Sequence, residues 1–162
     1  MIFAVVKCII FKNKQNIPWN DVEVFLKGFI GKKIIVKEYG DVINILGDFP
    51  DEFTESRYTK ALRGALAKAK ANAAQVIVEM IENADNRRWI ENKDNKHHKE
   101  ANGGWYRYDV GFAIPVENDG NMTQNKYSAT AVVRIKDDKL YLYDIINIKK
   151  KRVRRFSPKT VR

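Results

Sequence analysis

The chain has 162 residues, of which 44% are hydrophobic, and a formal net charge of +10 at pH 7. This length suits one domain with a proper core and is too short for two well-packed domains. The single cysteine excludes an intramolecular disulfide, and no apolar stretch is long enough to span a membrane. The apolar N-terminus lacks the basic segment and cleavage site of a signal peptide, so we expect a soluble cytoplasmic protein.

The positive charge is concentrated at the C-terminus. Residues 149–162 contain eight Lys or Arg and no acid, which leaves 22 basic and 20 acidic residues in a nearly neutral remainder. We therefore predict one domain over residues 1–148 and a basic tail over residues 149–162. A block of like charge is typical of a solvated arm, and it suits phosphate and acidic protein equally well. The tail residues predicted to contact nucleic acid are Lys150, Lys151, Arg152, Arg154 and Arg155.

The first third of the chain predicts a strand, a helix and a hairpin. Residues 2–11 are almost continuously apolar, which predicts a strand buried on both faces, with Cys8 inside it as an inert thiol. Apolar residues then recur at helical spacing over residues 19–29. Residues 33–37 and 42–46 resemble two strands joined by a tight turn.

Residues 52–84 predict the longest helix. Its apolar stripe follows the 3.6-residue period and consists of Tyr58, Leu62, Leu66, Ala69, Ala73, Val76, Met80 and Ala84. Lys60, Arg63 and Lys70 lie together on one flank of this stripe. Basic residues in such positions either extend their charges into solvent or face phosphate, and we include these three among the candidate nucleic-acid contacts.

The C-terminal third predicts an antiparallel meander. Residues 86–100 are densely charged around Trp89 and predict a short helix or an ordered loop. Three alternating runs follow, separated by the turn sequences ENDGN and KDD. Asp144 falls in the apolar register of the last run, where a carboxylate needs a cationic or donor partner. The predicted fold class is α+β, with helices packed on an antiparallel sheet in the order β-α-β-β-α-(α)-β-β-β.

The polar face of the meander carries the candidate catalytic residues Arg107, Arg134 and Tyr143, and His97 precedes the first run. Metal-independent RNA cleavage needs a general base, a general acid and cations for the phosphorane charge, and these residue types supply all three. The simpler interpretation is that Arg and Tyr form cross-strand pairs and that the histidine is solvated. No metal-binding spacing and no phosphate loop are present, so we predict neither a metal nor a cofactor.

Four runs resemble the third family of large polyvalent protein-associated domains: IPWNDVEVFLKGFIG, GDFPDEFTESRYTKALRGALAKAKANAAQ, ENKDNKHHKEANGGWYRYDVGFAIPV and KLYLYDIINIKK. The resemblance covers roughly residues 17–150 and implies an association with phage and other mobile genetic elements, without an established activity. It implies a histidine at the position of His97. The family often has a basic residue at the position of Gly111 and a histidine at the position of Ile135, so this chain departs from the pattern at both.

Helices followed by an antiparallel meander also resemble, at the level of topology, the barnase–EndoU–colicin–RelE ribonucleases. Two main hypotheses follow. The first is a metal-independent ribonuclease-like domain that acts on RNA phosphodiesters through His97, Arg107, Arg134 and Tyr143. The second is a non-catalytic module that binds nucleic acid, or a host or phage protein, through the sheet face and the basic tail. A third is a structural domain that docks through an edge strand of its sheet.

Overall fold

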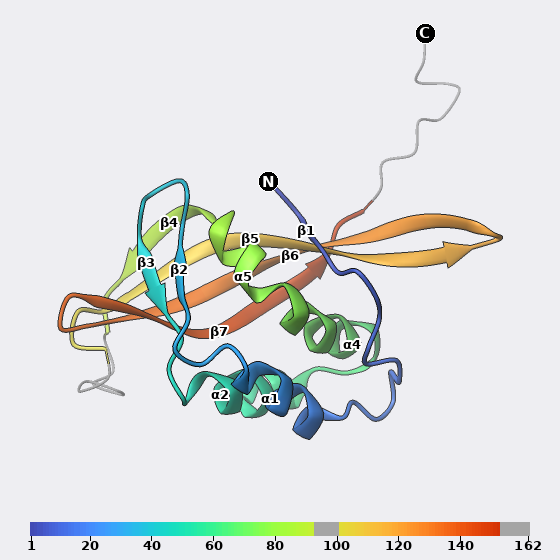
Figure 1. Ribbon diagram of the computed structural model, residues 1–162, viewed down its shortest axis with the longest axis horizontal. Helices are drawn as coiled ribbons and strands as arrows, with labels where there is room; N and C mark the ends of the chain where they lie inside the picture. Colours follow the sequence, from blue (N-terminus) through green and yellow to red (C-terminus); the bar gives the residue numbers. More distant parts are fainter. Residues whose placement is uncertain (93–100, 153–162) are drawn as a thin grey trace, which may run out of the picture.

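The computed structural model describes residues 1–92 and 101–152. In this part of the chain, seven strands form one sheet in the order β1-β5-β6-β7-β3-β2, with β4 also paired to β5. Figure 1 shows α1, α2 and α4 gathered on one side of this sheet. The strands are β1 (Ala4–Val5), β2 (Lys33–Ile35), β3 (Val42–Asn44), β4 (Asp85–Ile90), β5 (Trp105–Asn118), β6 (Asn121–Lys136) and β7 (Lys139–Lys150). The helices are α1 (Trp19–Lys27), α2 (Phe49–Glu55), α3 (Arg57–Ala61), α4 (Gly64–Ala73), the 3-10 turn η1 (Ala74–Val76) and α5 (Ile77–Glu82).

The meander predicted from the sequence is confirmed as β5, β6 and β7. Asp119 and Gly120 connect β5 to β6 with φ values of 51° and 79°, and Asp137 and Asp138 connect β6 to β7 with φ values of 49° and 62°. Two successive residues at positive φ produce the tight hairpin turns whose twist matches that of the flanking strands. Figure 1 shows that β5 and β6 continue past the rest of the sheet as a two-stranded ribbon.

Two irregularities in β7 interrupt its alternation. The register of the β6–β7 pair shifts between Ser128 and Thr130 and again between Val132 and Val133. Strict alternation would place Leu142 and Ile145, three residues apart, on opposite faces. They lie opposite Val133 and Ala131, which share one face of β6, and both are buried. A bulge re-aims the side chains beside it, so the alternation seen in the sequence does not hold through this strand.

The sheet is mixed, and the prediction of a purely antiparallel sheet was wrong. β1 runs parallel to β5, and β3 runs parallel to β7. The long buried strand predicted over residues 2–11 reduces to β1, because the segment that follows turns toward α4. There Asn72 accepts hydrogen bonds from the backbone N–H groups of Ile10 and Phe11, at 3.1 and 3.2 Å. Cys8, predicted to be buried, is exposed.

The single helix predicted over residues 52–84 is divided into several shorter helices. Ser56 ends α2 and caps α3, since its Oγ accepts a hydrogen bond from the N–H of Thr59 at 3.2 Å. Leu62 is extended and Gly64 has a φ of 62°, so α4 starts in a new direction. The apolar stripe therefore does not continue on one face, and this break decides where Lys70 points.

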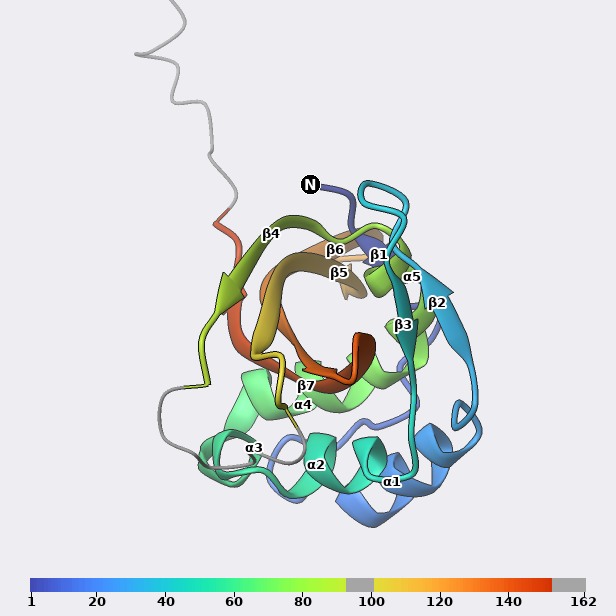
Figure 2. The same ribbon diagram turned by 90° about the vertical axis from the view of Figure 1, so that its left-hand side faces the viewer.

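The predicted helix or loop over residues 86–100 begins as a strand. β4 pairs antiparallel with β5, and Arg88 lies opposite Arg107. Figure 2 shows the sheet curling so that the β2–β3 hairpin approaches β4 from the other end of the sheet. Asp41 of that hairpin accepts two 2.8 Å hydrogen bonds from Arg87 of β4 and one of 2.7 Å from the hydroxyl of Tyr108. These contacts connect the two ends of the curled sheet.

Candidate nucleic-acid interface

A groove at the base of the β5–β6 ribbon collects positive charge from separate parts of the chain. It is lined by Phe3, Gln124, Asn125, Lys126, Lys150, Lys151 and Arg152. Four of these residues are cationic and none is acidic. Figure 1 shows the reason: the N-terminal segment, the first part of β6 and the end of β7 come together where the ribbon leaves the rest of the sheet. We call this the basic groove.

The pairing of β6 with β7 holds the lysines of the basic groove in place. Tyr127 lies opposite Lys150, and the N–H of Lys151 donates a 2.8 Å hydrogen bond to the carbonyl of Lys126. Lys126 and Lys151 are therefore neighbours on adjacent strands. Like charges in such positions repel each other, and among the described residues no carboxylate lines the groove to offset them. A bound anion would relieve this repulsion.

Phe3 reaches the basic groove because Gly111 makes room for the N-terminal segment. A Cβ atom at Gly111 would lie 2.8 Å from the Met1 sulfur and 2.8 Å from the Phe3 ring. The ammonium group of Lys126 lies 5.3 Å from the centre of that ring. Gly111 thus has a packing function in this chain, since it seats Phe3 beside a groove lysine.

A second, more polar hollow continues from the basic groove over the same face of the sheet and shares Lys151 with it. Its lining residues are Met1, Asp109, Ser128, Ala129, Thr130, Asn147, Lys149 and Lys151. Asp109 is the acidic residue of this hollow, and it is bound by Arg88 at 3.0 Å and by Asn86 at 2.8 Å. The carboxylate is therefore neutralised locally, and the hollow adds another lysine and two hydroxyl groups to the surface.

The four candidate catalytic residues have different environments. His97 lies outside the described residues. Arg107 is half-buried on the same side of β5 as Trp105, whose ring packs edge-on against Tyr143 at 5.0 Å between centroids. Arg134 is buried and forms an ion pair with Asp48, its guanidinium lying 5.5 Å from the ring centre of Tyr141. A substrate phosphate would have to compete with Asp48 for this arginine.

Lys70 is not on an exposed flank, as the sequence suggested, but fully buried. Its ammonium group donates hydrogen bonds to Asp144, at 2.8 Å, and to the hydroxyl of Thr59. This placement corrects its assignment as a nucleic-acid contact, because its charge is used inside the protein. The partner that Asp144 was predicted to require is confirmed, and it is Lys70.

Burial dominates the titration of this pair. Desolvation lowers the pKa of Lys70 and raises the pKa of Asp144, and the attraction between the two groups opposes both shifts. The backbone N–H of Ile145 also donates to Asp144, at 2.8 Å. Because neither side chain is accessible to solvent, the pair connects α4 to β7 and does not contact a substrate.

The other two basic residues predicted beside the helix stripe, Lys60 and Arg63, are exposed. The Arg63 guanidinium donates to the backbone carbonyls of Lys60 and Leu62, at the end of α3. Neither residue lines the basic groove. Of the tail residues, Lys150, Lys151 and Arg152 line it, while Arg154 and Arg155 lie outside the described residues.

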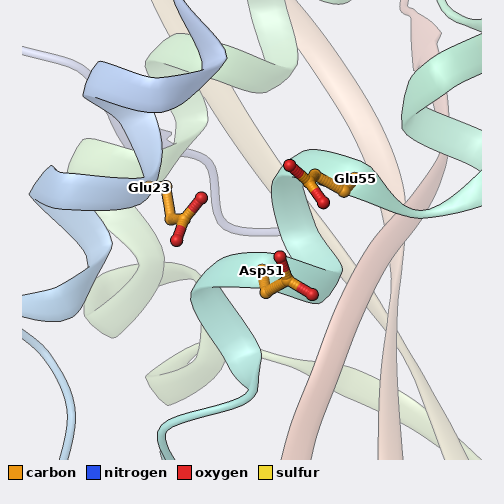
Figure 3. Close-up of side chains that lie close together, drawn as sticks. All are labelled: Glu23, Asp51 and Glu55. Carbon is orange, nitrogen blue, oxygen red and sulfur yellow. The ribbon is translucent and has the colours of Figure 1, made fainter.

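Three carboxylates, which sequence reasoning did not identify, come together on the helical side of the molecule. Figure 3 shows Glu23 of α1 near Asp51 and Glu55 of α2, and one oxygen from each lies within 4.8 Å of the others. Glu23 also lies 3.6 Å from Lys27 in an ion pair along α1. Two of the three carboxylates are exposed, so the cluster is compatible with ordinary solvation, and we infer no metal site from it.

Sequence reasoning identified Lys150, Lys151 and Arg152 but missed Phe3, Gln124, Asn125 and Lys126. Lys126 lies two residues before Ser128 on β6, so the alternation of the strand could have placed both side chains on the same face.

No family model, curated protein or solved structure matches the chain. Across residues 1–92 and 101–152, no helix combines the length and the apolar character needed to cross a membrane.

Proposed function

We propose that this protein is a nucleic-acid-binding module that holds the backbone of RNA in the basic groove. The observation that supports the proposal best is that four cationic side chains, and no carboxylate from the part of the chain that the structure describes, line one groove. Lysine and arginine bind phosphates mainly through charge and release the counterions of the nucleic acid. The neighbouring Phe3, Gln124 and Asn125 add a ring and two amides, which suit contacts to bases. The resemblance to polyvalent-protein domains favours an RNA of phage or mobile-element origin.

Replacing both Lys126 and Lys151 by glutamate should weaken the binding of a single-stranded oligouridine at least about tenfold at low salt. For single strands, each phosphate contact contributes about 0.7 to the slope of log affinity against log salt, so the slope should fall by about 1.4. Fluorescence anisotropy over a series of salt concentrations measures both quantities.

The matched control is the pair Lys33→Glu and Lys37→Glu, at exposed lysines beside the opposite edge strand β2. It changes the net charge equally and leaves the basic groove intact. Equal losses from both pairs would reduce the effect to net charge and contradict the proposed groove. Binding of an acidic protein but not of RNA would favour the protein-binding alternative.

A second candidate function is the metal-independent ribonuclease. It is supported by the placement of Arg107 beside the Trp105–Tyr143 pair, on the strand that follows the histidine segment. In this mechanism His97 would take the proton of the 2′-hydroxyl or protonate the leaving 5′-oxygen, and Arg107 would hold the phosphate. Arg134 would contribute after release from Asp48, and Tyr143 would orient the substrate or donate a proton.

His97→Ala should reduce RNA cleavage in the presence of EDTA by at least about 100-fold, the usual lower limit for loss of a general acid or base. The adjacent His98→Ala is the matched control and should cleave like the unsubstituted protein. The readout is the rate of cleavage of a labelled RNA on a denaturing gel. Equal cleavage by all three proteins, or none by any, would reject the ribonuclease and leave the binding module unaffected.

A further inference from the structure

A second groove lies on the other side of the β5–β6 ribbon, between the ribbon and the start of α4. Its volume is about 570 Å³, within the range of ordinary ligand sites. Leu66 forms part of its helical wall, and Ile114, Pro115 and Val116 form part of its ribbon wall. We call this the apolar groove.

The rim of the apolar groove is positively charged. Lys14, Lys68 and Lys150 lie on it, together with one carboxylate, that of Glu117. Tyr127, which is buried and stacked on Phe112, also lines the groove. An apolar floor below a cationic rim fits a ligand that joins a flat apolar group to an anion, and each nucleotide of a nucleic acid has this character.

The apolar groove and the basic groove are neighbours. Asn125 and Lys150 line both of them. A chain whose phosphates contact Lys151 and Arg152 would therefore reach the apolar groove without leaving the protein surface. The two grooves together separate the two parts of a nucleotide, with cations for its phosphate on one side and apolar side chains for its base on the other.

We propose that the apolar groove receives unstacked bases of a single-stranded nucleic acid while its phosphates stay at the basic groove. This inference rests on the proposed nucleic-acid-binding function and names the class of nucleic acid. In a duplex the faces of the bases are stacked inside the helix, so a base can enter an apolar site only from a single strand or after extrusion.

The direct test compares three probes of about 12 nucleotides, within the site size of single-strand binders. They are oligouridine, a ribose-phosphate chain of the same length without bases, and an RNA duplex. Because stacking of one base typically changes affinity by a factor of about ten, oligouridine should bind about tenfold more tightly than the abasic chain. It should also bind more tightly than the duplex at equal salt.

Leu66→Glu places a charge on the helical wall of the apolar groove and should weaken oligouridine binding about tenfold while leaving the abasic chain little affected. Val116→Glu makes the same change from the ribbon wall and serves if the Leu66 variant does not fold. Val24→Glu is the matched control, since Val24 is 66% exposed on α1, away from both grooves. It adds the same charge, so the difference from it isolates the contribution of the groove.

Each outcome separates this inference from the proposed function. Loss of oligouridine affinity in both groove variants, with the abasic chain unchanged, supports it. Equal affinity for oligouridine and the abasic chain overturns it and leaves the basic groove as a phosphate site. Tighter binding of the duplex overturns the single-stranded class. Failure of all three probes to bind removes both the inference and the proposed function.

Discussion

Replacing Lys70 by methionine should lower the free energy of unfolding by about 3–5 kcal/mol, the usual cost of removing one partner from a buried ion pair. Both side chains are almost inaccessible, with 0% of the Lys70 side chain and 4% of the Asp144 side chain exposed. Without the ammonium group, Asp144 keeps the hydrogen bond from the backbone of Ile145 but loses its countercharge. Urea denaturation monitored by circular dichroism measures the loss.

The matched control is Lys27→Met, which breaks the ion pair with Glu23 at a side chain that is 57% exposed. It should change stability by at most about 0.5 kcal/mol, since exposed ion pairs contribute little. The double variant Lys70→Met with Asp144→Leu should recover part of the loss, because it leaves no buried charge. A Lys70→Met protein as stable as the Lys27→Met protein would contradict the central role of this pair.

The loss in free energy of unfolding caused by Lys70→Met should depend on pH. Whether it grows or shrinks as pH rises follows from the pKa of Asp144. Burial raises the pKa of this carboxyl above its unfolded value, and Lys70 opposes that rise. In the variant, the native state therefore holds the proton of Asp144 more strongly than the unfolded state does. The stability contributed by protonated Asp144 is fully present below the unfolded pKa of about 3.9. It is lost as pH rises through the raised pKa of the folded state. The deficit should be larger at pH 8 than at pH 5.

Asp41→Ala should lower the free energy of unfolding by about 2–4 kcal/mol, because two charge-assisted contacts are lost and the buried hydroxyl of Tyr108 is left without this acceptor. Asp41 accepts from Arg87 and from Tyr108, whose pKa is raised by burial and by the hydrogen bond to Asp41. The Arg87 guanidinium also lies over two tyrosine rings, with its central carbon 4.5 Å from the ring centre of Tyr39 and 4.6 Å from that of Tyr106. The substitution therefore weakens the contact between β4 and the β2–β3 hairpin, where the backbone N–H of Arg87 still donates to the hydroxyl of Tyr39 at 2.9 Å. Chemical denaturation measures the change.

Asp109→Ala is the matched control for this prediction. It removes the aspartate of the neighbouring pair with Arg88, where the side chains are 41% and 33% exposed. The expected cost is at most about 1 kcal/mol. If Asp41→Ala cost no more than Asp109→Ala, the closure of the curled sheet would not depend on this carboxylate. Hydrogen exchange at β4 would then show equal protection in the two variants.

The meander and the need of Asp144 for a partner could be predicted from the sequence because both depend on neighbours along the chain. The identity of the partner could not, because Lys70 reaches Asp144 only after the backbone changes direction between Leu62 and Gly64. The helical periodicity continues through that break and gives no sign of it. Sequence patterns of this kind report local structure and not the packing of distant elements.

The edges of the sheet were predicted less well than its centre. β4 alternates between half-buried and exposed positions and contains two arginines, so it lacks the apolar pattern of a strand. β1 was predicted too long, because Asn72 binds the backbone of Ile10 and Phe11 from a position far along the chain. Only part of the basic groove could be predicted from the sequence. Its tail residues form a continuous basic run, whereas Phe3 and Lys126 join them only through the pairing of strands.

The order of strands in the sheet also determines when the protein can complete its fold. β1, β2 and β3 are synthesised first, yet β1 pairs with β5, and β3 pairs with β7. Ala4 lies beside Phe112, and Ile43 lies beside Leu140. Pairing across such separations closes long loops and is slow compared with the formation of local hairpins. The meander can form from neighbouring segments, whereas β1 can join the sheet only after β5 has been made, and β3 only after β7.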